Sequence, residues 1–349
     1  MATRREFLVR TAAASALGLE QAHGTGAIAK MSGPSAVGSL RTCKIPNTDL
    51  TVSRIAYGCA DLVPWDKDAL ETGSIAKADR VVNVAYDHGI TFFDTADIYS
   101  YGKAESALGQ VLKRSPRLRG KIVIQSKCGM AQYGDPPCND SSREHIVSSV
   151  ERSLKRLETD YLDILLLHVP DSLVEPEEVA QAFAQLKRNG RVRYFGVSNH
   201  TPSQIQVLKR NISEPLVVNQ VPLGIGHSKL ITEDDSSTGT LDYCRVTDMQ
   251  VQAYSPLRGG FLSTSWDTPP EIKEVGQVVE ELAAAKGTTS AAIALAWLLR
   301  HPANIVPIIG STNPEHVVED CKAGEITLTR KEWYLLFVAA DKLQGTRQG

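Results

Sequence analysis

The clearest indication of the architecture is the run Asp163-Ile164-Leu165-Leu166-Leu167-His168, which is apolar at four consecutive positions. A strand with one face in water alternates polar and apolar residues, whereas a strand buried on both faces is apolar throughout. Strands of the second kind are typical of parallel sheets that helices cover. The run therefore predicts a buried parallel strand over Asp163–Leu167, with His168 at its carboxyl end.

Similar short runs recur along the chain and alternate with amphipathic helical patterns. Eight strands are predicted, at Arg54–Tyr57, Thr91–Phe93, Ile122–Ser126, Asp163–Leu167, Tyr194–Val197, Leu216–Asn219, Gln250–Ala253 and Ile305–Ile308. The helical patterns between them include Lys77–His88, Ser141–Leu157, Pro176–Asn189 and Pro202–Arg210. Eight strand-then-helix units without a linker predict an α/β fold, a closed (β/α)8 TIM barrel, with a doubly wound sheet as the alternative.

Additional elements flank these eight units. The segments Cys43–Ile45 and Leu50–Val52 enclose four turn-forming residues and predict an N-terminal β-hairpin that caps one end of the barrel. Extra helices toward the C-terminus are predicted at Glu271–Lys286, Ser290–Arg300 and Arg330–Ala340. The predicted barrel domain spans residues 42–343.

The composition is that of a folded chain with a large core. Of 349 residues, 42% are hydrophobic and 22% are charged, and the net charge is −2 with both signs interspersed. This charge balance provides no single-sign field to hold a nucleic acid or an anionic membrane. The six cysteines lack the C-x-x-C spacing of zinc or dithiol sites, so we expect structural thiols and no metal. Neither disulfide pairing nor oligomeric state can be read from the sequence.

Residues 1–30 are predicted to be a leader rather than part of the fold. Thr3–Leu8 resembles the twin-arginine export signature, a weakly apolar stretch follows at Thr11–Leu19, and Ala27–Ala29 is a candidate cleavage site. The apolar stretch is shorter than the roughly 20 residues that a membrane span requires. We therefore expect export to the periplasm without a membrane anchor, and a cytoplasmic location if the Arg-Arg pair occurs by chance.

Four side chains with complementary chemistry follow the predicted strands. Barrel enzymes place their sites at the carboxyl ends of the strands. Asp94 follows the second strand, and Tyr99 comes five residues later. Lys127 follows the third strand and His168 the fourth, so we expect all four at one opening of the barrel.

Together these side chains can deliver a proton. The pKa of a tyrosine hydroxyl lies near 10, and an adjacent ammonium such as that of Lys127 lowers it by stabilising the phenolate. Asp94 can keep the buried ammonium charged, and His168 can hydrogen-bond a substrate carbonyl. Each side chain alone is equally expected in a structural ion pair or polar cap, so the prediction depends on their conjunction.

Amide, hydroxyl and aromatic groups follow the next strands. Ser198, Asn199 and Gln220 can bind a carboxamide, and the ring of Tyr254 can stack on a nicotinamide. Helix capping is the alternative for Ser198 and Asn199, because Thr201-Pro202 follows. After the eighth strand, the hydroxyl-rich segment Gly310–Pro314 precedes a helical pattern, which is typical of a site for a cofactor phosphate.

Six motifs resemble the aldo-keto reductase family, most closely its bacterial YdhF-like branch of oxidoreductases. They are Asp94-Thr95-Ala96-Asp97-Ile98-Tyr99, Ser126-Lys127-Cys128-Gly129, Leu165-Leu166-Leu167-His168, Gly196-Val197-Ser198-Asn199, Tyr254-Ser255-Pro256-Leu257 and Ile308-Ile309-Gly310-Ser311-Thr312. The resemblance covers about residues 42–343 in the family's order.

The resemblance implies reduction of a small-molecule aldehyde or ketone, or the reverse, with NADP or NAD. It makes Tyr99 the proton donor, tuned by Lys127 and Asp94, and it makes His168 the group that orients the carbonyl. The implied cofactor contacts are Ser198, Asn199 and Gln220 at the carboxamide, Tyr254 at the ring, Ser255 and Leu257 at the pyrophosphate, and Gly310, Ser311, Thr312, His316, Glu319 and Asp320 at the adenosine phosphate and adenine.

The sequence departs from the family at the adenosine end. Members that bind the 2′-phosphate commonly carry a basic residue and an arginine where this chain has Gly310 and His316, which weakens the case for NADP over NAD. Asp320 stands where the family often has asparagine, so its carboxylate can accept but not donate. We expect NADP, with NAD as the alternative.

Rival functions fit the sequence less well. A glycoside hydrolase needs facing carboxylates and a metal hydrolase needs clustered ligands, neither of which follows the strands. A non-catalytic sensor that binds nicotinamide cofactor remains the alternative, although it would not need the pairing of Lys127 with Tyr99. The nature of the carbonyl substrate is left open. Candidate walls of the substrate site are Trp65, His200, His227 and the loop Tyr133–Cys138.

Overall fold

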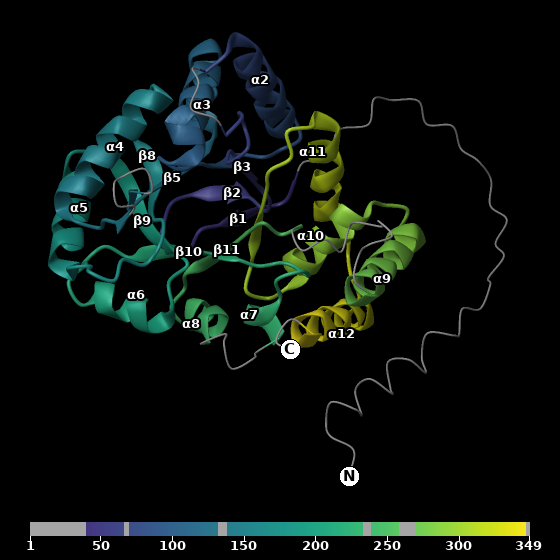
Figure 1. Cartoon of the computed structure of the whole chain (residues 1–349). Helices are drawn as coiled ribbons and strands as arrows, with labels where there is room; N and C mark the ends of the chain where they lie inside the picture. The colour runs from purple at the N-terminus through teal and green to yellow at the C-terminus, as the bar shows by residue number, and fades with distance from the viewer. Residues whose placement is uncertain (1–39, 66–69, 132–137, 233–238, 258–269, 347–349) are drawn as a thin grey trace, which may run out of the picture.

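The computed structural model describes residues 40–65, 70–131, 138–232, 239–257 and 270–346. The predicted leader, residues 1–30, and most of the loop Tyr133–Cys138 lie outside these ranges, so the export signal stays a prediction. Figure 1 shows the described residues as a ring of helices around a central set of strands.

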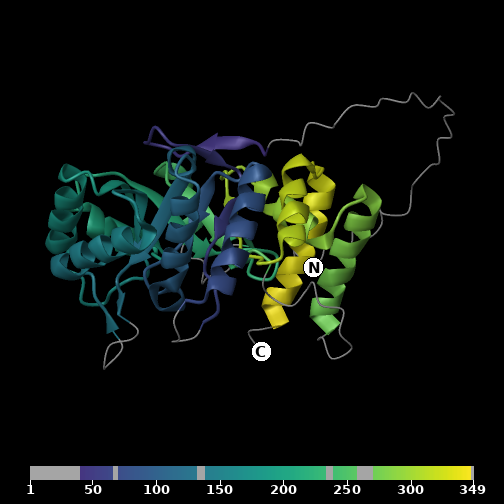
Figure 2. The same ribbon diagram turned by 90° about the horizontal axis from the view of Figure 1, so that it is seen from above.

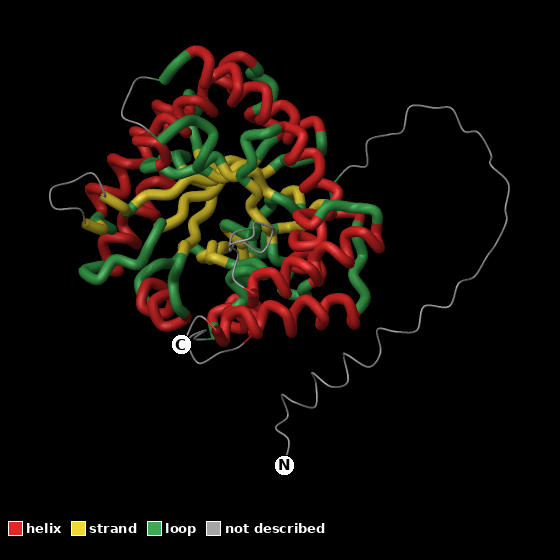
Figure 3. Tube along the Cα trace, turned by 45° about the vertical axis from the view of Figure 1, so that its right-hand side comes forward, coloured by secondary structure: helices red, strands yellow, loops and turns green. Residues whose placement is uncertain are grey.

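Eight parallel strands close into a barrel in the order β10-β11-β12-β3-β4-β5-β8-β9, which confirms the predicted TIM barrel. Figure 3 shows the strands enclosed by helices. The barrel strands are β3 (Ala56–Gly58), β4 (Phe92–Asp94), β5 (Val123–Cys128), β8 (Leu162–Leu167), β9 (Val192–Ser198), β10 (Leu216–Pro222), β11 (Gln250–Tyr254) and β12 (Val306–Ile309). Two antiparallel pairs lie outside the barrel sheet, namely β1 (Thr42–Lys44) with β2 (Thr51–Ser53) and β6 (Met130–Ala131) with β7 (Cys138–Asn139).

Helices follow the strands on the outside of the barrel. They are α2 (Thr72–Asp87), α3 (Lys103–Arg114), α4 (Arg143–Leu157), α5 (Pro176–Arg188), α6 (Pro202–Lys209), α7 (Lys229–Thr232), α8 (Thr240–Val246), α9 (Pro270–Lys286), α10 (Ser290–Arg300), α11 (Pro314–Cys321) and α12 (Arg330–Thr346), with short 3-10 helices η1 (Tyr99–Gly102), η2 (Arg119–Lys121) and η3 (Lys322–Glu325). The C-terminal helices α9 and α12 pack against each other. In the described residues no single helix is long and apolar enough to span a membrane, and one pair bent by 93°, at Ile272–Lys286 and Ser290–Arg300, meets the length and composition criteria together.

The hairpin β1–β2 closes one end of the barrel, as the sequence predicts. Ile45 and Val52 are fully buried and belong to the same apolar cluster as the strand residues Phe92 and Val123. Figure 2 shows the purple hairpin lying across one end of the molecule. Because alternate strand residues point into a barrel, this cluster forms the floor of its interior.

The inward positions become polar toward the opposite end of the barrel. In β5 they read Val123, Gln125 and Lys127. In β11, Gln252 joins this polar end through its hydrogen bonds to Gln125. The barrel interior therefore has an apolar layer over the hairpin and a polar layer above it. The candidate site lies in this polar layer.

The strands extend further than the sequence indicates. Asp94 was expected just after its strand, but it pairs with Gln125 and is the last residue of β4. Lys127 likewise lies within β5 and pairs with Leu166. Side chains held by strand pairing are positioned more rigidly than those on a loop.

Close packing of α3 on α4 requires a glycine. A Cβ at Gly109, in the middle of α3, would collide with the carbonyl oxygen of Arg156 and would lie 2.9 Å from the carbonyl carbon of Leu157. By contrast, a Cβ at Gly73, in the first turn of α2, would meet no atom within 4 Å. The two glycines therefore form a matched pair for testing the packing.

We predict that Gly109→Ala lowers the free energy of unfolding by about 1–3 kcal/mol, because backbone atoms of α4 would have to move. Gly73→Ala should raise it by about 0.5 kcal/mol, because alanine loses less chain entropy on forming a helix. Urea denaturation of both variants measures the difference, and equal stabilities would contradict the described packing of α3 on α4.

Candidate active site

The four side chains singled out in the sequence meet at the polar end of the barrel. The Nζ of Lys127 donates to Oδ2 of Asp94 at 2.7 Å, to the carbonyl oxygen of Thr95 at 2.9 Å and to the hydroxyl of Tyr99 at 3.0 Å. The ring of His168 meets that of Tyr99 edge-on, with centroids 5.7 Å apart and an interplanar angle of 83°. We call these residues the Asp-Tyr-Lys-His cluster (Asp94, Tyr99, Lys127, His168).

A strained turn holds Tyr99 over the barrel. Tyr99 begins η1, and the next two residues, Ser100 and Tyr101, have left-handed φ angles of 49° and 61°. Such conformations cost non-glycine residues roughly 1–3 kcal/mol each. The buried hydroxyl of Ser100 donates to the carbonyl oxygen of Val63 at 3.1 Å, which helps to hold the turn. This backbone strain could not be predicted from the sequence.

The charges of the cluster favour an ammonium beside a neutral hydroxyl. Burial alone lowers the pKa of Lys127, but Asp94 and Tyr99 outweigh it, so the net pKa is raised and the ammonium persists. Burial raises the pKa of Tyr99, and Lys127 only partly offsets that effect. The neighbouring charge alone predicts a lowered tyrosine pKa, and this prediction is wrong because burial has the larger effect. Tyr99 therefore stays protonated at neutral pH.

His168 is neutral over the physiological pH range. Burial, together with the positive charge of Lys127, lowers its pKa to about 3. Its Nδ1 is buried and has no hydrogen-bond partner among the described residues. A neutral imidazole that is not tied to another side chain can donate one hydrogen bond to a substrate oxygen.

Three buried glutamines lie beneath the cluster, and two of them were missed in the sequence. Gln125, Gln220 and Gln252 are at most 2% exposed. The Nε2 atoms of Gln125 and Gln220 donate to Oδ1 of Asp94 at 2.7 Å and 2.9 Å. The spacing in the sequence could have identified Gln125, because it precedes Lys127 by two residues and therefore shares its face of β5.

The predicted carboxamide-binding residues also come together. Ser198 donates to the carbonyl oxygen of Gln220 at 2.9 Å, and Asn199 donates to Oγ of Ser198 at 3.0 Å and to the carbonyl oxygen of His168 at 3.2 Å. The hydroxyl of Tyr254 donates to Oδ1 of Asn199 at 3.0 Å. Thr201 caps α6 through its own side chain, so the capping alternative does not account for Ser198 and Asn199.

Backbone strain recurs beside these residues. Asn199 and Ser255 have left-handed φ angles of 60° and 50°, and Leu257 ends the described part of the segment after β11. Left-handed residues with polar side chains at strand ends allow the chain to turn while its amide and hydroxyl groups point toward a ligand. This placement is compatible with the predicted nicotinamide and pyrophosphate contacts.

The predicted adenosine end lies at the start of α11. Asn313 caps this helix through its side chain, which accepts from the amide of Glu315 at 3.0 Å. Gly310 and Thr312 are exposed, and Oγ of Ser311 lies 3.4 Å from Nδ1 of His316. An exposed, hydroxyl-lined helix start with His316 nearby is suited to a phosphate.

Asp320 differs from its expected behaviour. It is 3% exposed, and burial, aided by the neighbouring charge of Glu319, raises its pKa to about 7. Near neutral pH much of this carboxyl is protonated. The protonated carboxyl can donate as well as accept a hydrogen bond, so the prediction that Asp320 accepts but does not donate is wrong near neutral pH.

The candidate substrate walls separate into two groups. Trp65 is 48% exposed, and its ring lies 6.1 Å from that of Tyr99, so it flanks the cluster. His200 is buried with Nδ1 2.7 Å from the carbonyl oxygen of Ser198, and it lines a separate cavity of about 260 Å³ with Leu167. Trp65 can therefore contact a substrate, whereas His200 packs behind the strands.

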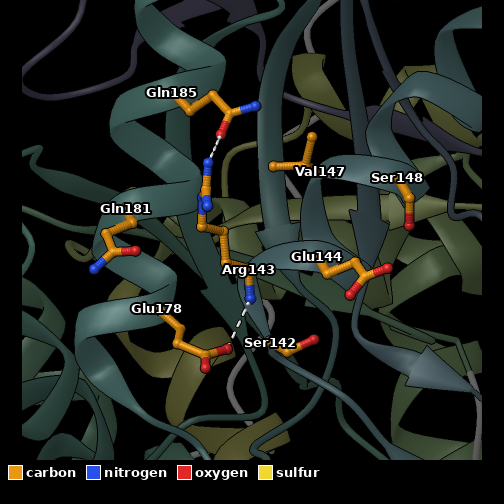
Figure 4. A pocket seen from close by; sticks show the side chains of 8 residues that line it. All are labelled: Ser142, Arg143, Glu144, Val147, Ser148, Glu178, Gln181 and Gln185. Carbon is orange, nitrogen blue, oxygen red and sulfur yellow. Dashed lines mark hydrogen bonds between the residues drawn. The ribbon is translucent and has the colours of Figure 1, made fainter.

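One pocket of the described residues lies on the outside of the barrel. It has a volume of about 660 Å³ between α4 and α5, where Arg143 donates to Gln185 and, through its backbone, to Glu178 (Figure 4). It contains none of the Asp-Tyr-Lys-His cluster. Among the described residues there is no group of three or more metal-ligating side chains, and all six cysteines are free thiols.

Comparisons with known proteins show the family to which the chain is similar. The model of the aldo/keto reductase family matches residues 58–336. The chain is 36% identical to the oxidoreductase YdhF of Escherichia coli over 292 residues, which cover 82% of this chain and 93% of YdhF. It is 34% identical to the 6-dehydroglucose reductase of Agrobacterium fabrum over 299 residues, 83% of this chain and 95% of that enzyme. The crystal structure of the thermostable aldo-keto reductase Tm1743 with the inhibitor epalrestat has a TM-score of 0.73 at 29% identity, covering 86% of this chain and 100% of that one.

The lowered pKa of His168 predicts a pH-dependent loss of stability. The unfolded histidine takes up a proton near pH 6.5, whereas the folded one does so only near pH 3. Stability contributed by the neutral imidazole is therefore complete above pH 6.5 and is lost as the pH falls toward 3, by up to about 1.4 kcal/mol per pH unit. Urea denaturation of wild type and His168→Gln between pH 4.5 and 7.5 should show the wild type losing stability relative to the variant. Parallel curves would mean that folding does not lower the pKa of His168.

Proposed function

Because the chain belongs to the aldo/keto reductase family and is therefore an oxidoreductase of carbonyls and alcohols, we propose that Tyr99 is its proton donor. The reaction is the reduction of an aldehyde or ketone to an alcohol, or the reverse. The observation that carries this proposal is the position of Lys127, whose ammonium contacts both the carboxylate of Asp94 and the hydroxyl of Tyr99.

A nicotinamide cofactor fits the residues present. Ser198, Asn199 and Gln220 form one hydrogen-bonded group of amides and hydroxyls, which matches the donors and acceptors of a carboxamide. Tyr254 is held by Asn199 beside them and can support the ring. When bound, the cofactor would supply the hydride that adds to the carbonyl carbon.

The chain's own residues would manage the proton. The Tyr99 hydroxyl gives its proton to the carbonyl oxygen as the C–O double bond becomes an alcohol, and the resulting phenolate recovers a proton from solvent. Lys127 stabilises that phenolate, and its charge is fixed by Asp94. Neutral His168 donates a hydrogen bond to the same oxygen and so sets the orientation of the carbonyl.

The cofactor is NADP in our proposal, with NAD also accepted. Ser311 and Thr312 at the start of α11 are suited to the 2′-phosphate, but Gly310 contributes no charge there and His316 is a weaker partner than arginine. The carboxyl of Asp320 has the protonated form needed to replace an asparagine at adenine. The 6-dehydroglucose reductase activity of the Agrobacterium relative makes an oxidised sugar the first substrate to assay.

We predict that Tyr99→Phe lowers the single-turnover rate of aldehyde reduction by NADPH by about 100-fold or more, because the general acid is removed. Binding of NADPH, followed by fluorescence, should stay within about threefold, because the hydroxyl contributes to the transition state rather than to binding the cofactor. Tyr161→Phe is the matched control, since Tyr161 precedes β8 and contacts Arg119. An unchanged rate in Tyr99→Phe would sink the proposed role, and cofactor binding without turnover by the wild type would favour the sensor.

Cofactor choice gives a second prediction. His316→Arg should tighten NADPH binding about five- to tenfold and leave NADH within about twofold, because a guanidinium can bind the 2′-phosphate in a bidentate manner. The gain in NADPH affinity should be smaller at high salt, because salt screens the charge of the guanidinium. His316→Gln is the control and should not raise the preference for NADPH. Equal tightening of both cofactors would show that residue 316 does not face the 2′-phosphate.

A further inference from the structure

Four side chains form a closed ring of hydrogen bonds in the polar layer of the barrel. The Nε2 of Gln125 donates to Oδ1 of Asp94 and to Oε1 of Gln252, both at 2.7 Å. The Nε2 of Gln220 donates to the same two oxygens at 2.9 Å and 3.0 Å. We call this set the glutamine ring (Asp94, Gln125, Gln220, Gln252).

The ring is fully buried and joins strands from across the barrel. Its members come from β4, β5, β10 and β11, and none is more than 3% exposed. A further bond runs from Nε2 of Gln252 to Oε1 of Gln125 at 3.0 Å. A buried amide left without a hydrogen-bond partner costs about 1–3 kcal/mol. Side-chain rotations that break bonds of the ring are therefore unfavourable.

On one side the ring acts on the proton donor. Asp94 accepts two amide hydrogens at Oδ1, while Lys127 binds Oδ2 at 2.7 Å. The two amide donors therefore fix the orientation of the Asp94 side chain, with Oδ2 toward Lys127 and, through Lys127, toward Tyr99.

On the other side the ring orients Gln220. Both amide hydrogens of its Nε2 are used within the ring. The Oε1 of Gln220 is therefore the atom that remains available to a ligand. This oxygen can accept a hydrogen bond from the NH2 group of a carboxamide. A glutamine free to rotate would present NH2 as readily as oxygen.

We propose that Gln125 and Gln252 are positioning residues that hold Gln220 ready for the cofactor carboxamide while fixing the side chain of Asp94 against the Lys127–Tyr99 pair. This inference rests on the proposed function and extends it. Through the ring, the residue that binds the carboxamide and the residues that deliver the proton share one hydrogen-bond network.

The test compares NADPH with a cofactor fragment that lacks nicotinamide, 2′-phospho-ADP-ribose. Gln252→Met keeps the side-chain length but removes the acceptor shared by Gln125 and Gln220. We expect it to weaken NADPH about tenfold, the value of one oriented hydrogen bond, and to change fragment binding by less than about twofold. Gln250→Met is the matched control, because Gln250 is buried on the same strand two residues away, where it contacts Cys43 near the hairpin.

Gln252→Glu provides a second, independent readout. Its protonated carboxyl can accept from Gln125 and Gln220 and donate to Oε1 of Gln125, as glutamine does. Burial and the nearby Asp94 should raise the pKa of this carboxyl. The single-turnover rate at low pH should therefore approach that of the wild type and should fall as the carboxyl ionises at higher pH, with no matching fall in the wild type.

The outcomes separate the two proposals. Wild type that neither binds NADPH nor reduces aldehydes would reject the proposed function and this inference with it. If the wild type is active but Gln252→Met weakens the binding of NADPH and of the fragment equally, or changes neither, the inference alone is rejected. If Gln252→Met does not fold, the pH profile of Gln252→Glu decides, and a profile parallel to that of the wild type overturns the proposal.

Discussion

The buried ammonium of Lys127 is the constraint on which the site depends. A fully buried charge is tolerated only when it is paired and hydrogen-bonded, and here Asp94, Thr95 and Tyr99 take its three hydrogens. Strand pairing fixes Asp94 and Lys127, and the strained turn after Tyr99 brings the hydroxyl to the third hydrogen. The same charge helps to keep His168 neutral. One buried cation thus fixes the hydrogen-bond geometry of its neighbours, while burial has the larger effect on the pKa values of Tyr99 and His168.

The barrel supports this constraint from below. The hairpin and the apolar layer, with Ile45 and Val52 at its base, close the floor of the barrel. The glutamine ring then lies between this floor and the cluster, so that the carboxylate is surrounded by fixed amides rather than water. Fixed donors stabilise a charge without the reorganisation that water would require. The apolar layer of the barrel therefore contributes stability, and the polar layer above it carries the residues that act on the substrate.

The sequence was sufficient for the features that depend on local pattern. Strands buried on both faces appear as apolar runs, so all eight could be located, and polar residues at their carboxyl ends identified Asp94, Lys127 and His168. Features that depend on tertiary contacts could not be found in this way. The bonds of Gln125 and Gln252 connect strands 127 residues apart, the left-handed turn at Ser100 is stabilised by Val63, and the pKa values of Tyr99 and Asp320 are set by burial. Strand parity alone could have identified the two glutamines as inward-facing.

The most direct measurement of the central claim is a crystal structure of the protein with oxidised cofactor and an alcohol product. The account predicts the alcohol oxygen within hydrogen-bond distance of the Tyr99 hydroxyl and the His168 imidazole, and the carboxamide on Ser198, Asn199 and Gln220. A cofactor bound elsewhere, or a Tyr99 hydroxyl turned away from both Lys127 and the alcohol, would contradict it.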